Sequence, residues 1–195
     1  MTTLKITIAD IDDLGYYNGS VDLANFDGNI EIDTGGRGWC RFKTSVNASG
    51  YIDSRGSLYV DGYIDSVGYI KSGGDIKSCD FINAGDINSS GNIVSGGDIK
   101  SGGYIYSVGY IDSGGDIKAG YINSGGYIYS GGYIKSFGDI KSGGDIFSVD
   151  FINSAGYIDS RGYVYTKGLV TCKKLQIGEV ASGKLFETTL VDQAC

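Results

Sequence analysis

The chain has 195 residues, of which 34 are glycine and 16 are tyrosine, and it contains neither proline nor histidine. Its 16 basic and 23 acidic residues give a formal net charge of -7. This balance argues against direct binding of nucleic acid or of an anionic membrane, because both need a basic face for phosphates. The missing histidine removes the commonest general base and the commonest metal ligand.

The N-terminal residues MTTLKITIADIDD become acidic where a signal peptide would be apolar, and no apolar run approaches the ~18 residues of a membrane span. The four cysteines, Cys40, Cys79, Cys172 and Cys195, have no CxxC spacing. We therefore expect no zinc site, no cofactor and no membrane association. Free thiols in the cytoplasm are the expected state, and a disulfide is left open.

Residues 1–49 contain short segments with alternating apolar residues, namely LKITIADI, GNIEID and WCRFKTSV. Alternation of this kind predicts short, half-buried strands. We expect this part of the chain to form an N-terminal β cap with the entry coils of the repeat that follows.

Residues 50–168 repeat one phrase, as in GYIDSV and GDIKSG, with an aliphatic anchor at every sixth residue. Only the intervals from Ile82 to Ile87 and from Ile117 to Ile122 are five residues long. A glycine usually stands two positions before the anchor and a serine two positions after it. Because alternate side chains of a strand share a face, these three residues point inward, and the residues flanking the anchor point outward.

This pattern predicts an all-β, single-stranded β-solenoid in which neighbouring coils pair strand on strand. Three hexads make a triangular coil of about 18 residues, and two make a flattened coil of about 12. The two short intervals lie six hexads apart, which places them on one edge of a triangular solenoid. We favour the triangle, although the flattened coil also satisfies this spacing. Inward serines are expected to hydrogen-bond backbone groups at the corners.

Residues 169–195 lose the glycine repeat, as in CKKLQIGEV and KLFETTLVD. A solenoid must cover its terminal strand edges, so we expect a C-terminal cap here. The alternative is that one end of the solenoid is a docking surface, through which the chain forms a homo-oligomer.

The repeat I-x-S-x-G-[YD] resembles the hexapeptide-repeat left-handed β-helix family, which implies a left-handed solenoid for residues 50–168. Familiar members are acyltransferases and a zinc carbonic anhydrase, and their activities depend on histidine, which this chain lacks. The phrases GDIKSGGDI and GYIDSVGYI are also similar to bactofilins, bacterial cytoskeletal proteins that polymerise end to end. The glycine–isoleucine repeat followed by TCKKLQIG is similar to uncharacterised bacterial and phage repeat proteins, which implies no activity.

Asp80 and Asp150 each replace the usual glycine in a D-F-I-N setting. They lie four coils apart, whereas the carboxyl groups of an acid/base pair lie within about 10 Å. We expect both to be structural corner residues whose carboxylates accept backbone amides. No residue is assigned a catalytic role.

Outward aromatic side chains form the candidate binding surface. In triangular register they fall in two neighbouring columns, the first with Tyr110, Tyr127 and Tyr163 and the second with Tyr129, Phe147 and Tyr165. Such ladders stabilise a sheet through cross-strand packing, and exposed tyrosine patches also bind proteins or sugars. The pattern is compatible with both interpretations.

These observations predict a non-enzymatic interaction protein that presents a rigid surface rich in tyrosine and aspartate to a protein partner, for example as an inhibitor. One alternative is an acidic mimic of DNA that blocks a nucleic-acid enzyme, as anti-restriction and anti-CRISPR proteins do. A second alternative is a filament-forming structural protein similar to bactofilins.

Overall fold

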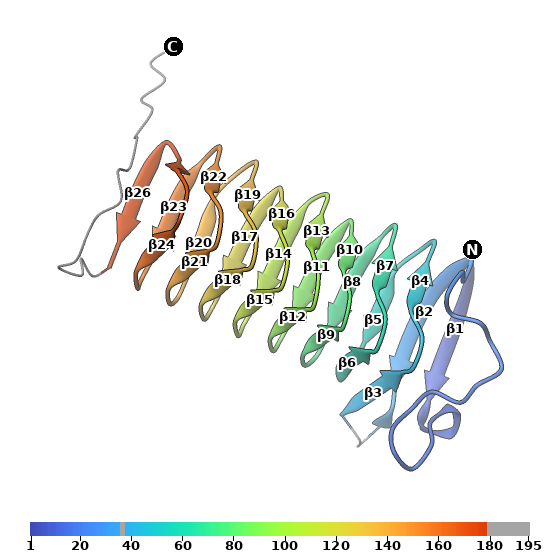
Figure 1. Cartoon of the computed structure of the whole chain (residues 1–195). Helices are drawn as coiled ribbons and strands as arrows, with labels where there is room; N and C mark the ends of the chain where they lie inside the picture. The colour runs from blue at the N-terminus through green and yellow to red at the C-terminus, as the bar shows by residue number, and fades with distance from the viewer. Residues whose placement is uncertain (36–37, 179–195) are drawn as a thin grey trace.

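The computed structural model describes residues 1–35 and 38–178 and shows an all-β solenoid (Figure 1). Its strands form three parallel sheets, and the chain visits the three sheets in turn, which gives about eight coils. The only helix among the described residues is η1 (Ile8–Asp10), a single 3-10 turn. We call the three sheets face 1, face 2 and face 3, in the order in which each coil builds them.

Face 1 has ten strands: β1 (Thr2–Thr7), β2 (Gly28–Asp33), β5 (Ile52–Ser54), β8 (Tyr69–Ser72), β11 (Asp86–Ser89), β14 (Tyr104–Ser107), β17 (Tyr121–Ser124), β20 (Ile140–Ser142), β23 (Tyr157–Ser160) and β26 (Lys174–Ile177). Face 2 has eight strands: β3 (Trp39–Phe42), β6 (Ser57–Val60), β9 (Ile76–Ser78), β12 (Ile93–Ser95), β15 (Ile111–Ser113), β18 (Ile128–Ser130), β21 (Ile146–Ser148) and β24 (Val164–Thr166). Face 3 also has eight: β4 (Val46–Ala48), β7 (Ile64–Ser66), β10 (Ile82–Ala84), β13 (Ile99–Ser101), β16 (Ile117–Ala119), β19 (Ile134–Ser136), β22 (Ile152–Ser154) and β25 (Val170–Thr171).

The register of these sheets confirms the triangular coil over the flattened one. Anchors lie opposite anchors in successive coils, as Ile93 does with Ile111, which is 18 residues later (111 - 93). The interval falls to 17 where a coil contains a five-residue step, as between Ile70 and Ile87 (87 - 70). Both short steps, β10 to β11 and β16 to β17, lie on the edge between face 3 and face 1, as the spacing predicted.

The interior of the solenoid consists of the anchors and the inward serines. The isoleucine anchors from Ile52 to Ile158 are fully buried. All but one of the inward serines donate their hydroxyl hydrogen to a backbone carbonyl of the preceding coil, which confirms the predicted role. The exception is Ser54, whose buried Oγ has no hydrogen-bond partner among the described residues. The corner of the preceding coil, between β2 and β3, has more residues than a corner of the repeat.

Glycine is required at corners where one coil packs directly on the next. A Cβ atom at Gly114 would lie 2.2 Å from the carbonyl oxygen of Gly96, closer than any real Cβ contact. The corners therefore stack backbone on backbone, which keeps side chains away from that part of the surface.

The N-terminal edges of the three sheets bind residues from the start of the chain. Strand β1 pairs with β2 and extends face 1. On face 2, the Tyr17 N–H donates to the carbonyl of Arg41, and the Arg41 N–H donates to that of Gly15. On face 3, the Phe26 N–H donates to the carbonyl of Asn47. The segment before β2 thus adds a strand to face 1 and makes isolated β-bridges to the edge strands of face 2 and face 3.

Both ends contribute coils to the solenoid. Strands β2, β3 and β4, within the part expected to be the N-terminal cap and entry coils, pair in register with the repeat. Strands β25 and β26, within the expected C-terminal cap, continue face 3 and face 1. Residues 179–195 of that expected cap lie outside the described residues. Among the described residues, no helix combines the length and the apolar character needed to cross a bilayer.

Candidate interaction surface

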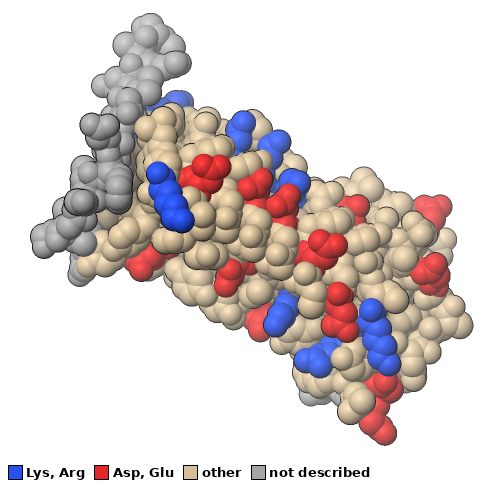
Figure 2. All heavy atoms as spheres, in the orientation of Figure 1, with Lys and Arg blue, Asp and Glu red and all other residues tan. Residues whose placement is uncertain are grey.

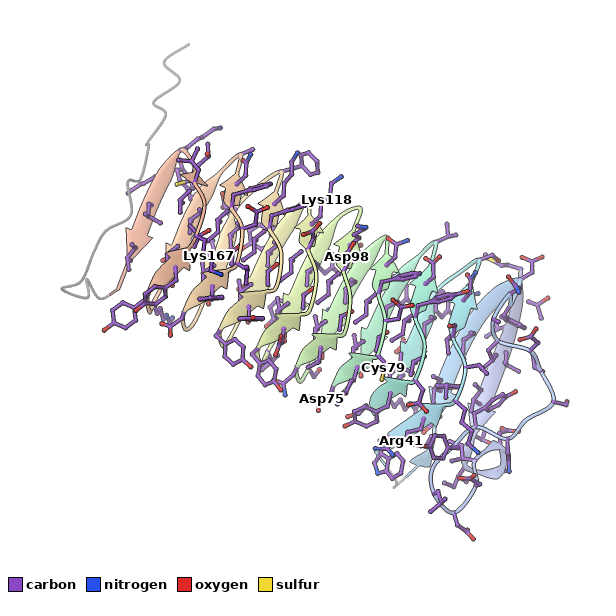
Figure 3. All side chains as sticks on the ribbon, viewed as in Figure 1. Arg41, Asp75, Cys79, Asp98, Lys118 and Lys167 are labelled. Carbon is purple, nitrogen blue, oxygen red and sulfur yellow. The ribbon has the colours of Figure 1, made fainter. Side chains whose placement is uncertain are left out.

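The outward surface is built from the residue before each anchor and the residue after it. Aspartate or asparagine before the anchor often joins two coils, because its side-chain oxygen accepts a backbone N–H of the next coil. Asp98 Oδ1 accepts the N–H of Asp116 (2.9 Å), and Asp145 Oδ1 accepts that of Tyr163 (2.7 Å). Figure 3 shows side chains projecting from successive coils along the rod, with Asp98 just before β13 and Lys118 on the neighbouring strand β16 of face 3.

An aromatic residue before the anchor joins two coils by ring stacking instead of by a hydrogen bond to the backbone. Tyr110 and Tyr127 stack with centroids 4.6 Å apart and an interplanar angle of 6°. Their separation matches the spacing of adjacent strands, so the register of the coils itself places the rings face to face. A stacked pair presents its ring edges and hydroxyl groups to solvent.

The structure brings the six predicted aromatic residues together on face 2 and the corners that precede its strands. Tyr129 and Phe147 stack with centroids 5.1 Å apart, and Tyr163 contacts Tyr165 in a tilted arrangement at 5.7 Å. Tyr165 follows Phe147 in register. Tyr127 and Tyr165 are the most exposed of the six, at 40% and 45%. We call these six residues the aromatic face.

The first predicted column is not continuous. Asp145 lies between Tyr127 and Tyr163, because β21 separates β18 from β24 on face 2. The column predicted to hold Tyr110, Tyr127 and Tyr163 therefore has one stacked pair, then a carboxylate that binds the backbone of the next coil, then the third tyrosine.

Stacked aromatic pairs also occur outside the aromatic face, where the sequence analysis did not single them out. Face 1 has Tyr51 with Tyr69 (4.9 Å), and face 3 has Tyr63 with Phe81 and Tyr133 with Phe151 (4.7 and 4.8 Å). Alignment of the repeat at the coil length would have found them, since all occupy the position before an anchor. Stacking is therefore a general means of joining coils, and it contributes to the stability of every face.

Asp112 differs from the other outward carboxylates of face 2. It is half-buried, and in register it lies between Val94 of one coil and Tyr129 of the next. Burial raises the pKa of its carboxyl group. Burial, Asp112 and Tyr110 together raise the pKa of the Tyr127 hydroxyl, so Asp112 lies close to the stacked tyrosine pair.

Asp80 and Asp150 lie at corners between face 2 and face 3, four strands apart along face 2. In the described chain, both residues form hydrogen bonds through their backbone groups. The Asp80 N–H donates to Ser78 Oγ (3.2 Å), its carbonyl accepts the Gly97 N–H, and the carbonyl of Asp150 accepts the hydroxyl of Thr166. The carboxylates that accept backbone amides belong instead to residues before the anchors, such as Asp98.

The surface charge is mixed. Figure 2 shows lysine and arginine between aspartate and glutamate on the visible side of the rod. On face 3, Lys100, Lys118 and Lys135 align in register, and Lys100 Nζ lies 2.7 Å from Asp98 Oδ2. This pair lowers the pKa of Asp98 and raises that of Lys100 through their hydrogen bond.

The described cysteines, Cys40, Cys79 and Cys172, are free. Burial raises the pKa of the Cys40 thiol to about 12 and also raises that of Cys172. Cys79 is exposed at a corner after β9. Within residues 1–35 and 38–178, no three His, Cys, Asp or Glu side chains gather where they could hold a metal ion.

The fold and surface define the chain as a β-solenoid protein with an aromatic face. A scan of the sequence against protein-family models matches none of them. Comparisons with curated proteins and with solved structures also find no significant match.

Proposed function

We propose that this protein is a non-enzymatic binding protein that presents the aromatic face to a protein partner. The observation that supports this proposal is the gathering of six aromatic side chains on one rigid eight-stranded sheet. Tyrosine and tryptophan are enriched where protein interfaces are strongest, because each buries a large apolar area and retains a polar group. Inhibition of the partner is the role we assign to this binding.

A parallel solenoid suits this role because its surface loses little conformational freedom on binding. Three of the four anchors beneath the aromatic face, Ile111, Ile128 and Ile146, are fully buried, and Val164 is partly buried. Stacking already holds Tyr110 on Tyr127 and Tyr129 on Phe147. Side chains that are ordered before binding reduce the entropic cost of an interface.

The charge distribution favours this proposal over a mimic of DNA. Such a mimic needs carboxylates in a continuous double row, whereas lysines align on face 3 and basic side chains interrupt the acidic ones on the side of the rod seen in Figure 2. A partner recognised through aromatic side chains fits this surface better.

The N-terminal edges favour the proposal over a bactofilin-like filament. Head-to-tail polymerisation needs a free strand edge at both ends of the solenoid. The backbone of Gly15, Tyr17 and Phe26 already binds the N-terminal edges of face 2 and face 3, whereas face 1 ends in the edge strand β1. Light scattering over a wide concentration range tests both the filament and the homo-oligomer through a cap, since each predicts a mass that rises with concentration.

We place the protein in the cytoplasm. Cys79 is exposed and free, and a reducing compartment maintains such a thiol. The proposed activity is binding alone, and it assigns no catalytic residue, metal or cofactor.

The experiment that tests the proposal is affinity capture from a lysate of the source organism with the full chain immobilised. We compare the wild type with the double variant Tyr127→Ala/Tyr165→Ala. Tyr104→Ala/Tyr157→Ala is the matched control, because these tyrosines are similarly exposed on face 1, at 41% and 53%. A protein retained by the wild type and the control but lost by the face 2 variant supports the proposal. Equal retention by all three chains would contradict it.

A further inference from the structure

Asp112 is the one aspartate after an anchor, in the described repeat, that has neither a lysine aligned with it in an adjacent coil nor a side-chain hydrogen bond. Four aspartates occupy this position between residues 50 and 168: Asp53, Asp65, Asp112 and Asp159. The first aligns with Lys71 and the last with Lys141, while Asp65 accepts a hydrogen bond from Asn83 Nδ2 (2.9 Å). The neighbours of Asp112 in register are Val94 and Tyr129, which supply no positive charge.

The surroundings of Asp112 are aromatic on two sides and open on a third. Tyr129 stacks on Phe147 of the next coil, so the opposite face of its ring is directed toward the coil of Asp112. The stacked rings of Tyr110 and Tyr127 lie beside Asp112 in the neighbouring column. On the other side, the stacked positions are Gly96, Gly114 and Gly131, which have no side chains to cover the carboxylate.

The local charge of face 2 is acidic. From β12 to β21, the strands of face 2 and the corners on either side of them contain Asp98, Asp112, Asp116, Asp145 and Asp150 and no lysine or arginine. Asp145 is already engaged by the Tyr163 N–H. A half-buried carboxylate with no positive charge among its neighbours in register lies next to a ring face on which no other aromatic ring stacks in the described chain. This arrangement is complementary to a planar cation. A guanidinium group pairs with a carboxylate and stacks on an aromatic ring at the same time.

We propose that Asp112 and Tyr129 bind an arginine side chain of the protein partner, with the guanidinium paired to the carboxylate and packed on the free ring face. This inference rests on the proposed function and specifies the chemistry of the partner. Arginine is also enriched at the centres of protein interfaces, next to tyrosine.

The test uses the full chain and a capped tri-arginine peptide, with a capped tri-citrulline peptide as the neutral analogue of the same shape. Binding is followed by NMR at the Asp112 carboxyl carbon and the Tyr129 ring, in ~0.15 M salt so that long-range attraction is screened. We expect tri-arginine to shift both signals and tri-citrulline to leave them unchanged. Asp112→Asn should weaken binding about fivefold, as expected when the ion pair is lost and the contact with the Tyr129 ring remains.

Asp65→Asn is the matched control, because Asp65 occupies the same position in its coil on face 3 and already has a hydrogen-bond partner. It should change the affinity less than twofold. Equal weakening by both variants, or shifts at Asp112 that tri-citrulline reproduces, would overturn the assignment. The capture experiment separates the two proposals. If tyrosine-dependent capture persists while Asp112→Asn has no effect on either capture or peptide binding, the binding function stands and the arginine site is wrong.

Discussion

The hydroxyl oxygen of Ser113 lies 2.8 Å from the carbonyl oxygen of Gly97, one coil earlier in the solenoid. The same contact recurs along the interior and links each coil to the one before it. Because the serines are buried, their hydrogen bonds satisfy carbonyl groups that water does not reach.

Ser113→Ala should lower the free energy of unfolding by about 1 kcal/mol, because it removes a buried hydrogen bond and leaves its acceptor less satisfied. Ser54→Ala is the matched control, since the hydroxyl of Ser54 is buried without a partner. That change should leave the stability unchanged or raise it, because it removes an unsatisfied polar group. Denaturant unfolding of the two variants and the wild type measures both effects. A similar loss in both variants would show that the hydrogen bond is not the cause.

Two corner glycines provide a second pair of substitutions, for which we expect opposite effects on stability. Gly114→Ala should destabilise the chain by about 1–3 kcal/mol, since its Cβ would lie 2.2 Å from the carbonyl oxygen of Gly96 and the coils would have to separate. At Gly102 the nearest atom, the carbonyl oxygen of Gly85, would be 3.7 Å away, and the backbone has no positive φ. Gly102→Ala should therefore stabilise the chain by about 0.4–1 kcal/mol, mainly by restricting the unfolded state. Thermal and denaturant unfolding test the opposite signs, and two changes of the same sign would refute the steric argument.

The fold can be predicted from the sequence because every hexad has the same pattern of inward and corner residues. An anchor, an inward serine and a corner glycine recur at fixed spacing, so the position of one coil determines the next. The sequence could not choose the triangular coil alone, because six hexads also make three flattened coils. The pairing of Ile93 with Ile111 in the next coil shows that the coil is triangular. This pairing between coils is not encoded in any single hexad.

The aromatic face was predictable in its members but not in all its contacts. Periodicity places Tyr110 and Tyr127 in one column, and they stack. Periodicity does not reveal that Asp145 separates Tyr127 from Tyr163, unless every coil is aligned at its own length of 17 or 18 residues. The lack of a positively charged neighbour at Asp112 depends on Val94 and Tyr129, the residues aligned with it in the adjacent coils. It can therefore be found only when the register of the coils is known.

Tyr51 should make the stability depend on pH in alkaline solution. Its hydroxyl donates to Glu31 Oε1 (2.8 Å), and this hydrogen bond, with burial and the negative charge of Glu31, raises the pKa of Tyr51 to about 12. A pKa that is higher in the folded state gives stability that is fully present below the ordinary value of 10.0 and is lost as the pH rises toward 12. The stability difference between wild type and Tyr51→Phe should therefore shrink from pH 9 to pH 11.5. A constant difference across this range would mean that the Tyr51 hydrogen bond does not contribute to the pH dependence.

The three described cysteines should differ sharply in reactivity. Cys79 is exposed, whereas Cys40 and Cys172 are buried and burial raises their thiol pKa values. In a Cys195→Ser background, a thiol reagent at neutral pH should modify Cys79 quickly and the other two only after denaturation, since the thiolate is the reactive form. Mass spectrometry of the native and denatured chain counts the modified sites. Rapid native modification of Cys40 would show that the interior opens near β3.

Stacking and partner binding can be separated on the aromatic face by a double-mutant cycle. Tyr129→Ala and Phe147→Ala, alone and together, should give a coupling of about 0.5–1.5 kcal/mol in unfolding, because the rings stack at 5.1 Å. Tyr104 and Tyr121 are also aligned in adjacent coils, but they are not among the stacked pairs of the described chain, so the same cycle there should give a coupling near zero.

A surface that only stabilises the solenoid predicts that capture of a partner falls in proportion to the lost stability. A binding surface predicts that Tyr127→Ala/Tyr165→Ala abolishes capture while the chain remains folded by circular dichroism, and that outcome would assign the aromatic face to recognition.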